Sequence, residues 1–178
     1  LIQEFKLPID DLFMEVQVSR EELKEVLDKN LLKPGVWLRT RKSEEEKYHD
    51  AIYMGFNKEI NKHQVAHFFY DEKYKKANEQ LENSEVRIDD ISLMSDLYKF
   101  EIRVPMMPLP KSLDEIVHDT NKEVEQWKNL KWTKETDPEL YNTLIKSYQY
   151  FVPKVHGFTR ESYEQKSGSN KSFFMGGM

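Results

Sequence analysis

Residues 97–110 read LYKFEIRVPMMPLP, and this stretch separates two unlike halves of the chain. Its first part alternates: Tyr98, Phe100, Ile102 and Val104 fall on one side, and Lys99, Glu101 and Arg103 on the other. This period of two predicts a strand with a buried apolar face and a solvated polar face. Pro105 lacks a backbone donor and ends the strand, and the later prolines keep the chain extended.

Upstream of this stretch, the sequence predicts further strands over residues 11–18, 36–41 and 51–56. Between the first two, Ser19 and Glu22 form a capping box that begins a helix ending near Asn30. We predict another helix over residues 63–81, because residues 73–82 are rich in helix formers. Residues 84–96 are predicted to be irregular.

Downstream, a second capping box at Ser112 and Glu115 begins a helix that continues to about Leu130. Asp137 followed by proline begins a last helix, which Pro153 is expected to end. The predicted fold is therefore α+β, with a mostly antiparallel sheet of about four strands from the N-terminal half. Helices cover this sheet, including the two C-terminal ones.

The domain prediction is one α+β domain over residues 1–164, followed by a flexible tail over 165–178. Within the domain we distinguish a strand-rich part at 1–104, a proline connector at 105–110 and a helical part at 111–164. A chain of 178 residues is long enough to bury a core without disulfides.

Composition excludes several classes of site. The chain has no cysteine, which rules out disulfides, thiolate nucleophiles and cysteine-ligated zinc. A net charge of −5 disfavours nonspecific binding of nucleic acid or anionic membranes by the whole protein. Without a long apolar run or a secretory leader, we expect a cytoplasmic protein with no membrane contact and no cofactor.

The segment His63-Gln64-Val65-Ala66-His67 places two histidines four residues apart. On a helix they would share a face and could bind a metal, with Asp71 one turn further on as a third ligand. Zinc proteases need Glu after the first histidine as the general base, and Gln64 cannot serve as one. We therefore expect no zinc or manganese there and keep a metal-dependent hydrolase as an alternative.

A second alternative concerns Asp90, Glu101 and Arg103. Acidic residues followed by an acid and a cation on a strand are the arrangement with which metal-dependent nucleases hold Mg²⁺ at a phosphate. The alternation of the predicted strand also fits a plain solvated face, so a nuclease remains an alternative interpretation.

The C-terminal residues 144–178 carry five basic and two acidic side chains, against the acidic balance of the whole chain. Aromatic residues, among them Tyr163, Phe173 and Phe174, lie between these charges. Basic groups interleaved with aromatics can hold single-stranded nucleic acid, which makes the tail a third alternative.

The connector supplies the apolar residues Met106, Met107 and Leu109 between prolines. If exposed, they form a stiffened ridge suited to binding a partner, and if buried, they form an ordinary packed connector. We add Tyr163, Phe173 and Phe174 of the tail to this set of partner-binding residues. The sequence favours a non-enzymatic interaction protein with a protein partner that is basic, as in the transcription or replication machinery. Because lysine outnumbers arginine by 21 to 6, as AT-rich genomes produce, a phage-type regulator is one version of this interpretation. The oligomeric state stays open.

Overall fold

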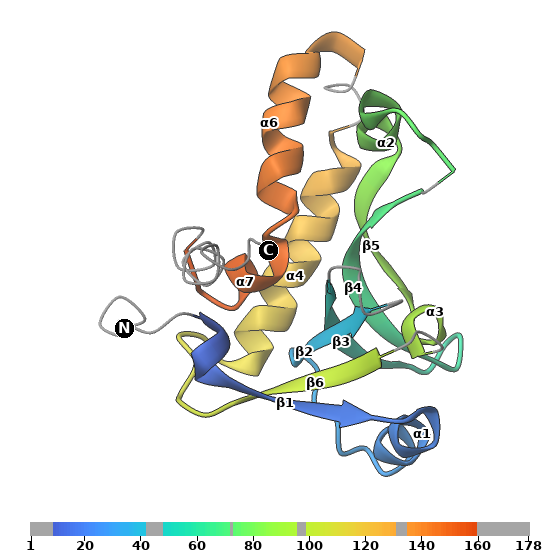
Figure 1. Cartoon of the computed structure of the whole chain (residues 1–178), viewed down its shortest axis with the longest axis vertical. Coiled ribbons are helices and arrows are strands. Elements are labelled where there is room, and N and C mark those ends of the chain that lie inside the picture. The colour runs from blue at the N-terminus through green and yellow to red at the C-terminus, as the bar shows by residue number, and fades with distance from the viewer. Residues whose placement is uncertain (1–8, 42–47, 72, 96–98, 131–134, 160–178) are drawn as a thin grey trace.

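The computed structural model describes residues 9–41, 48–71, 73–95, 99–130 and 135–159. Its centre is one antiparallel sheet with the strand order β1-β6-β2-β3-β4-β5 (Figure 1). The strands are β1 (Phe13–Val18), β2 (Trp37–Arg41), β3 (His49–Asn57), β4 (Lys62–Tyr70), β5 (Ser84–Asp90) and β6 (Lys99–Pro105). The α+β class and the antiparallel pairing are confirmed, whereas the sheet has six strands and not four.

The described helices are η2 (Ile9–Leu12), α1 (Arg20–Asp28), α2 (Ala77–Glu82), α3 (Ser92–Ser95), α4 (Leu113–Lys128), α6 (Pro138–Tyr148) and α7 (Phe151–Val155). Both predicted capping boxes are present, at the N-termini of α1 and α4. Asp137 caps α6 as predicted, since its Oδ1 accepts a hydrogen bond from the N–H of Leu140 at 3.1 Å. These caps satisfy backbone donors that would otherwise lack partners.

The two faces of the sheet bury separate clusters. On the helical face, α4, α6 and α7 cover the larger cluster, which includes Phe13, Trp37, Ile52, Phe68 and Val86 of the strands and Ile116, Trp127 and Ile145 of the helices. The opposite face carries α1, and its smaller cluster includes Leu23, Leu38, Ala51, Val65, Met94 and Phe100. Both faces therefore contribute to stability.

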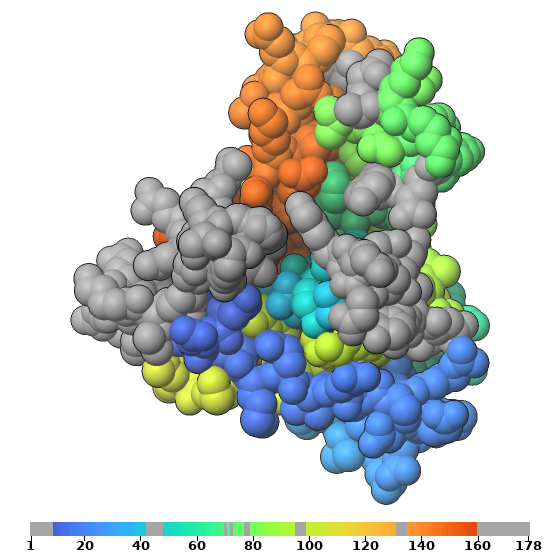
Figure 2. All heavy atoms as spheres, in the orientation of Figure 1, coloured from blue at the N-terminus to red at the C-terminus, as the bar shows by residue number. Residues whose placement is uncertain are grey.

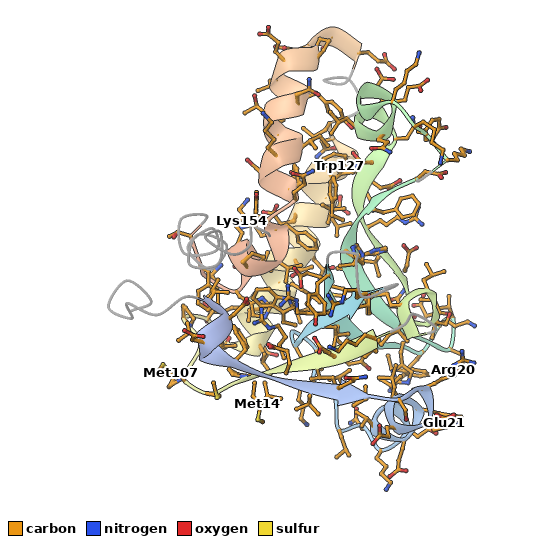
Figure 3. The ribbon with its side chains drawn as sticks, in the orientation of Figure 1. Met14, Arg20, Glu21, Met107, Trp127 and Lys154 are labelled. Carbon is orange, nitrogen blue, oxygen red and sulfur yellow. The ribbon has the colours of Figure 1, made fainter. Side chains whose placement is uncertain are left out.

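The sheet twists strongly, so that β4 and β5 run along α4 while β1 and β6 lie across its base (Figure 1). Trp127 of α4 anchors the upper part, with its ring edge-on to Phe68 at 6.1 Å and to Tyr148 at 4.9 Å. Lower down, Lys154 of α7 donates to Glu123 of α4 at 2.9 Å. Figure 3 labels Trp127 and Lys154 on these helices.

The prediction for residues 63–96 is wrong in two places. Residues 62–70 form β4 and not a helix, and only Ala77–Glu82 of the helix-forming run is helical. Residues 84–90, predicted as irregular, form β5, which pairs with β4 along its whole length.

The predicted strand at 98–104 is confirmed as β6, but the assignment of its faces is wrong. Glu101 and Arg103 are buried on the helical face, where solvent was expected. Phe100 is buried on the opposite face, and Val104 is exposed there. β6 pairs with β1 and β2, so it lies inside the sheet, one strand from the edge.

The last helix also differs from its prediction. It is interrupted after Tyr148, and Pro153 lies within α7 instead of ending a helix. Proline is tolerated there because the first turn of a helix has no acceptor for its N–H. The predicted flexible tail at 165–178 lies outside the described residues. Among the described helices, none is long and apolar enough to cross a bilayer.

Candidate functional site

Four exposed apolar side chains lie together at the β1–β6 edge of the opposite face. Met14 is 51% exposed, Val16 38%, Val104 37% and Met106 59%. Met14 is directly opposite Val104 in the ladder, and Val16 is opposite Ile102. Met106 follows β6, and its N–H donates to the carbonyl of Leu12 at 2.9 Å, which places it beside the start of β1. We name these four residues the Met14 patch.

The surroundings of the Met14 patch explain why its side chains are exposed. The cluster under α1 includes Val18, Phe100 and Ile102, so this helix covers one end of the β1–β6 pair. Figure 3 shows Met14 pointing away from the layer of α4, α6 and α7. In Figure 2, atoms of η2 and β1 lie on the surface next to those of the connector that follows β6. The other end of the pair therefore keeps its apolar side chains at the surface.

Only one of the three residues of the predicted ridge belongs to the Met14 patch. Met106 belongs to it, whereas Met107 and Leu109 pack against the core of the helical face. Tyr163, Phe173 and Phe174 lie outside the described residues. Sequence reasoning missed Met14 and Val16, although their alternation with Glu15 and Gln17 was visible. That alternation alone cannot reveal that the face is uncovered.

The two histidines of the metal alternative lie on β4, so the helical spacing behind that idea does not apply. On a strand, residues four apart are about 13 Å from each other, too far to share an ion. His63 Nδ1 instead lies 2.7 Å from the hydroxyl of Tyr53. Asp71 accepts from the N–H of Lys73 in a local turn. Among the described residues, no three His, Asp or Glu side chains form a group that could hold a metal.

His67 belongs to a hydrogen-bonded chain that crosses β3, β4 and β5. Its Nδ1 lies 2.9 Å from Nε2 of His49, and its Nε2 lies 2.6 Å from Oδ2 of Asp89. Arg87 donates to the same carboxylate oxygen at 2.6 Å and lies over the ring of Phe69. Burial raises the pKa of Asp89, but the hydrogen bonds from His67 and Arg87 outweigh burial and lower this pKa overall.

The ionised carboxylate of Asp89 fixes the direction of one hydrogen bond in this group. An ionised carboxylate can only accept, so Nε2–H of His67 donates to Asp89, and one hydrogen is shared between His67 Nδ1 and His49 Nε2. A His–Asp pair of this kind can orient a general base. Here, however, both nitrogens of the buried His67 ring are occupied. These hydrogen bonds therefore link three strands, and neither nitrogen of His67 is available to a substrate.

The residues of the nuclease alternative do not converge. Asp90 on β5 and Glu101 on β6 are four strand positions apart, which corresponds to about 19 Å. Asp90 accepts from the backbone N–H of Ser92, which lowers the pKa of its carboxyl, and a contact with Lys62 acts in the same direction. Asp90 thus caps α3.

Arg103 and Glu101 instead join a buried network of paired charges on the helical face. Arg103 donates to Asp10 and to Glu15, each at 2.7 Å, and its guanidinium lies 4.7 Å from the rings of Phe13 and Trp37. Glu101 contacts Lys99 at 3.5 Å. Internal partners thus hold Arg103 and one oxygen of Glu101, and this favours a structural role.

Comparison of the chain with protein-family models, with curated proteins and with solved structures finds no match. Function is therefore argued from the geometry of the site.

Proposed function

We propose that this chain is a non-enzymatic interaction protein that binds a protein partner through the Met14 patch. One observation carries the proposal: four apolar side chains, each more than a third exposed, lie side by side on a part of the sheet face that none of the described elements covers. Single exposed apolar residues are ordinary, but adjacent ones mark interaction sites. Two of the four are methionines, whose flexible side chains adapt to irregular partner surfaces.

The charges near the patch favour a basic partner. Asp11 lies just before β1 and is exposed, as are Glu21 and Glu22 in the first turn of α1. A protein surface with an apolar centre and basic rim would complement this arrangement and would be steered towards the acidic chain. Many basic protein partners belong to the transcription or replication machinery. They are the partners we propose, with a phage-type regulator as one version of the idea.

Binding through an apolar patch needs no catalytic group, and the observed chemistry fits this. The histidine chain and the buried charge network are occupied by internal partners. Neither alternative enzyme gains support from these contacts, so we rank both below the interaction protein.

The test uses the chain as bait in a bacterial extract, followed by binding measurements with the purified captured protein. Met14→Glu with Val104→Glu should weaken that binding about tenfold or more, since charges are then forced into an apolar contact. Leu31→Glu is the matched control, because Leu31 is 63% exposed but lies outside the patch. Affinity should also fall with salt if charge steers the encounter.

Equal binding by the double variant and the control would contradict the proposal. A labelled single-stranded oligonucleotide provides the comparison with the tail alternative. Tight binding of it at physiological salt, lost on deletion of residues 165–178, would replace the protein partner with nucleic acid.

A further inference from the structure

We infer that β1 pairs with β1 of a second copy of this chain, antiparallel and about a two-fold axis at Val16. The two sheets would then continue into each other, and the two Met14 patches would lie side by side on one face. This inference goes beyond the proposed function, because it concerns the backbone edge of β1 and not the sheet face.

The first observation is that β1 has an open edge. In the part of the chain that the structure describes, β1 pairs with β6 alone and stands at one end of the sheet. The hydrogen bond from Met106 N–H to the Leu12 carbonyl identifies these opposite residues as a hydrogen-bonded pair. Because hydrogen-bonded pairs alternate with non-hydrogen-bonded ones along an antiparallel ladder, Met14, Val16 and Val18 direct their backbone groups to β6. The N–H and C=O groups of Glu15 and Gln17 therefore point outwards.

The second observation is that β1 has little of the usual protection of an edge strand. Edges are normally guarded by lysine, proline, a bulge or inward-pointing charges. The strand FMEVQV contains no lysine or proline, and its register with β6 is regular. Its one charge, Glu15, is paired with Arg103. The other edge strand, β5, is guarded by the charged residues Glu85, Arg87, Asp89 and Asp90.

The sequence of β1 selects one register for self-pairing. In an antiparallel pair of identical strands centred on Val16, this residue faces the partner's Val16, and Met14 faces the partner's Val18. Glu15 then faces the partner's Gln17, whose amide can donate to its carboxylate. Centring on Glu15 would set two carboxylates directly opposite each other, which is unfavourable.

The backbone agrees with this register. Glu15 and Gln17 carry the outward groups, and they are the residues that the Val16-centred pair brings opposite each other. Each would exchange both hydrogen bonds with its counterpart. Opposite residues in a ladder share a face, so Met14 and Val16 of both copies would form one apolar strip.

The absence of cysteine makes the inference directly testable. Val16→Cys places one thiol on each copy at the axis, where a non-hydrogen-bonded antiparallel pair has Cα atoms about 4.5 Å apart. This separation lies within the range of a disulfide, about 4.4–6.8 Å. Mild oxidation should therefore convert the Val16→Cys protein to a covalent dimer.

Two variants serve as controls. Gln17→Cys lies on the same edge, but each copy's residue faces the partner's Glu15, so we expect slow cross-linking. Leu31→Cys provides an exposed thiol away from the edge. For the unmodified chain, light scattering should report a mass approaching two 21.4 kDa chains as concentration rises.

Two results would overturn the inference: Val16→Cys cross-linking no faster than both controls, or an unmodified chain that stays monomeric at high concentration. Failure here is separate from failure of the proposed function. If the chain is monomeric but partner binding is lost on substitution of Met14 and Val104, only the inference of a dimer is contradicted. If the chain is dimeric but those substitutions leave partner binding unchanged, only the proposed partner site is contradicted.

Discussion

Arg103 spans the helical face of β6 with no part of its side chain exposed. Burying a guanidinium group is costly unless its charge and its donors are matched. Two carboxylates, from Asp10 and Glu15, match its charge and two of its nitrogens, and its guanidinium lies over the rings of Phe13 and Trp37. This one residue therefore ties η2, β1 and β2 to β6.

The alternation in residues 98–104 predicted the strand correctly, but it could not tell which side is the interior. Period two separates apolar from polar side chains only where one face meets water. Here α1 covers only one end of one face of β6, and the other face is buried beneath charged groups around Arg103. Arg103 is buried beside carboxylates from distant parts of the chain, and Glu101 is buried beside its neighbour Lys99. Sequence patterning does not show that these two positions face the interior.

Phe100 gives a prediction at this scale. It is buried in the cluster under α1, so Phe100→Ala should reduce the free energy of unfolding by about 3–5 kcal/mol. Val104→Ala is the matched control, because Val104 is on the same strand and face but 37% exposed. It should cost less than about 1 kcal/mol, since surface substitutions rarely cost more. Urea denaturation of both variants measures the difference.

A loss below about 1 kcal/mol for Phe100→Ala would mean that the cluster under α1 adds little to stability. The helical face would then hold the fold alone, and the role we assign to the opposite face would be wrong.

At the scale of elements, the main error concerns β4. Its residues His63, Val65, His67 and Phe69 lie on one face, and Gln64, Ala66 and Phe68 lie on the other. Each face mixes polar and apolar groups, so no clear period of two survives. The helix-forming residues 73–82, just downstream, then favoured the prediction of a helix, although only Ala77–Glu82 of that run is helical. Pairing with β3 and β5 decided the outcome, as tertiary contacts often override propensity.

The candidate site shows the same limit. Met106 could be proposed from its composition and its neighbouring prolines. Met14 joins it only because β1 pairs with β6, a contact between segments far apart in the sequence. The histidine chain likewise needs three strands in the correct register. Local sequence indicates elements, whereas a site made from several elements requires their pairing.

The strand geometry of β4 sharpens the prediction about metal. His63 and His67 are about 13 Å apart on a strand, so they cannot ligate one ion together. We expect far less than one equivalent of zinc or manganese in protein purified without chelators, as measured by elemental analysis. One equivalent of zinc that disappears in His63→Ala would contradict this and revive the hydrolase alternative.

At the scale of the whole molecule, His156 lies where the helical layer meets the sheet. It follows α7, donates from Nδ1 to the carbonyl of Val152 at 2.9 Å and packs against Trp37 of β2 at 5.1 Å. Burial lowers its pKa from 6.5 to about 4, and backbone hydrogen bonds with Val152 and Gly35 only partly oppose this. The fold therefore keeps this ring neutral at neutral pH.

The depressed pKa of His156 predicts a pH dependence of stability. Between about pH 6.5 and pH 4, the unfolded chain binds a proton at this residue and the folded chain does not. The free energy of unfolding should therefore fall as the pH falls through this window, by about 3 kcal/mol in total from this group. Below about pH 4 both states are protonated, so His156 contributes no further loss. Urea denaturation at several pH values between 7 and 4 measures the slope.

His156→Asn isolates this contribution, because asparagine keeps an N–H donor near Val152 but does not titrate. The variant should be less stable at pH 7, where it leaves part of the ring's volume empty, yet its stability should fall less between pH 6.5 and pH 4. Asp89 and Asp90, whose pKa values are lowered, lose their contribution as the pH falls further, through those lowered values. They therefore act mainly below this window and affect both proteins alike. Parallel curves for the two proteins would show that His156 is protonated within the fold, and the contact between α7 and the sheet would then have to tolerate a charge beside Trp37.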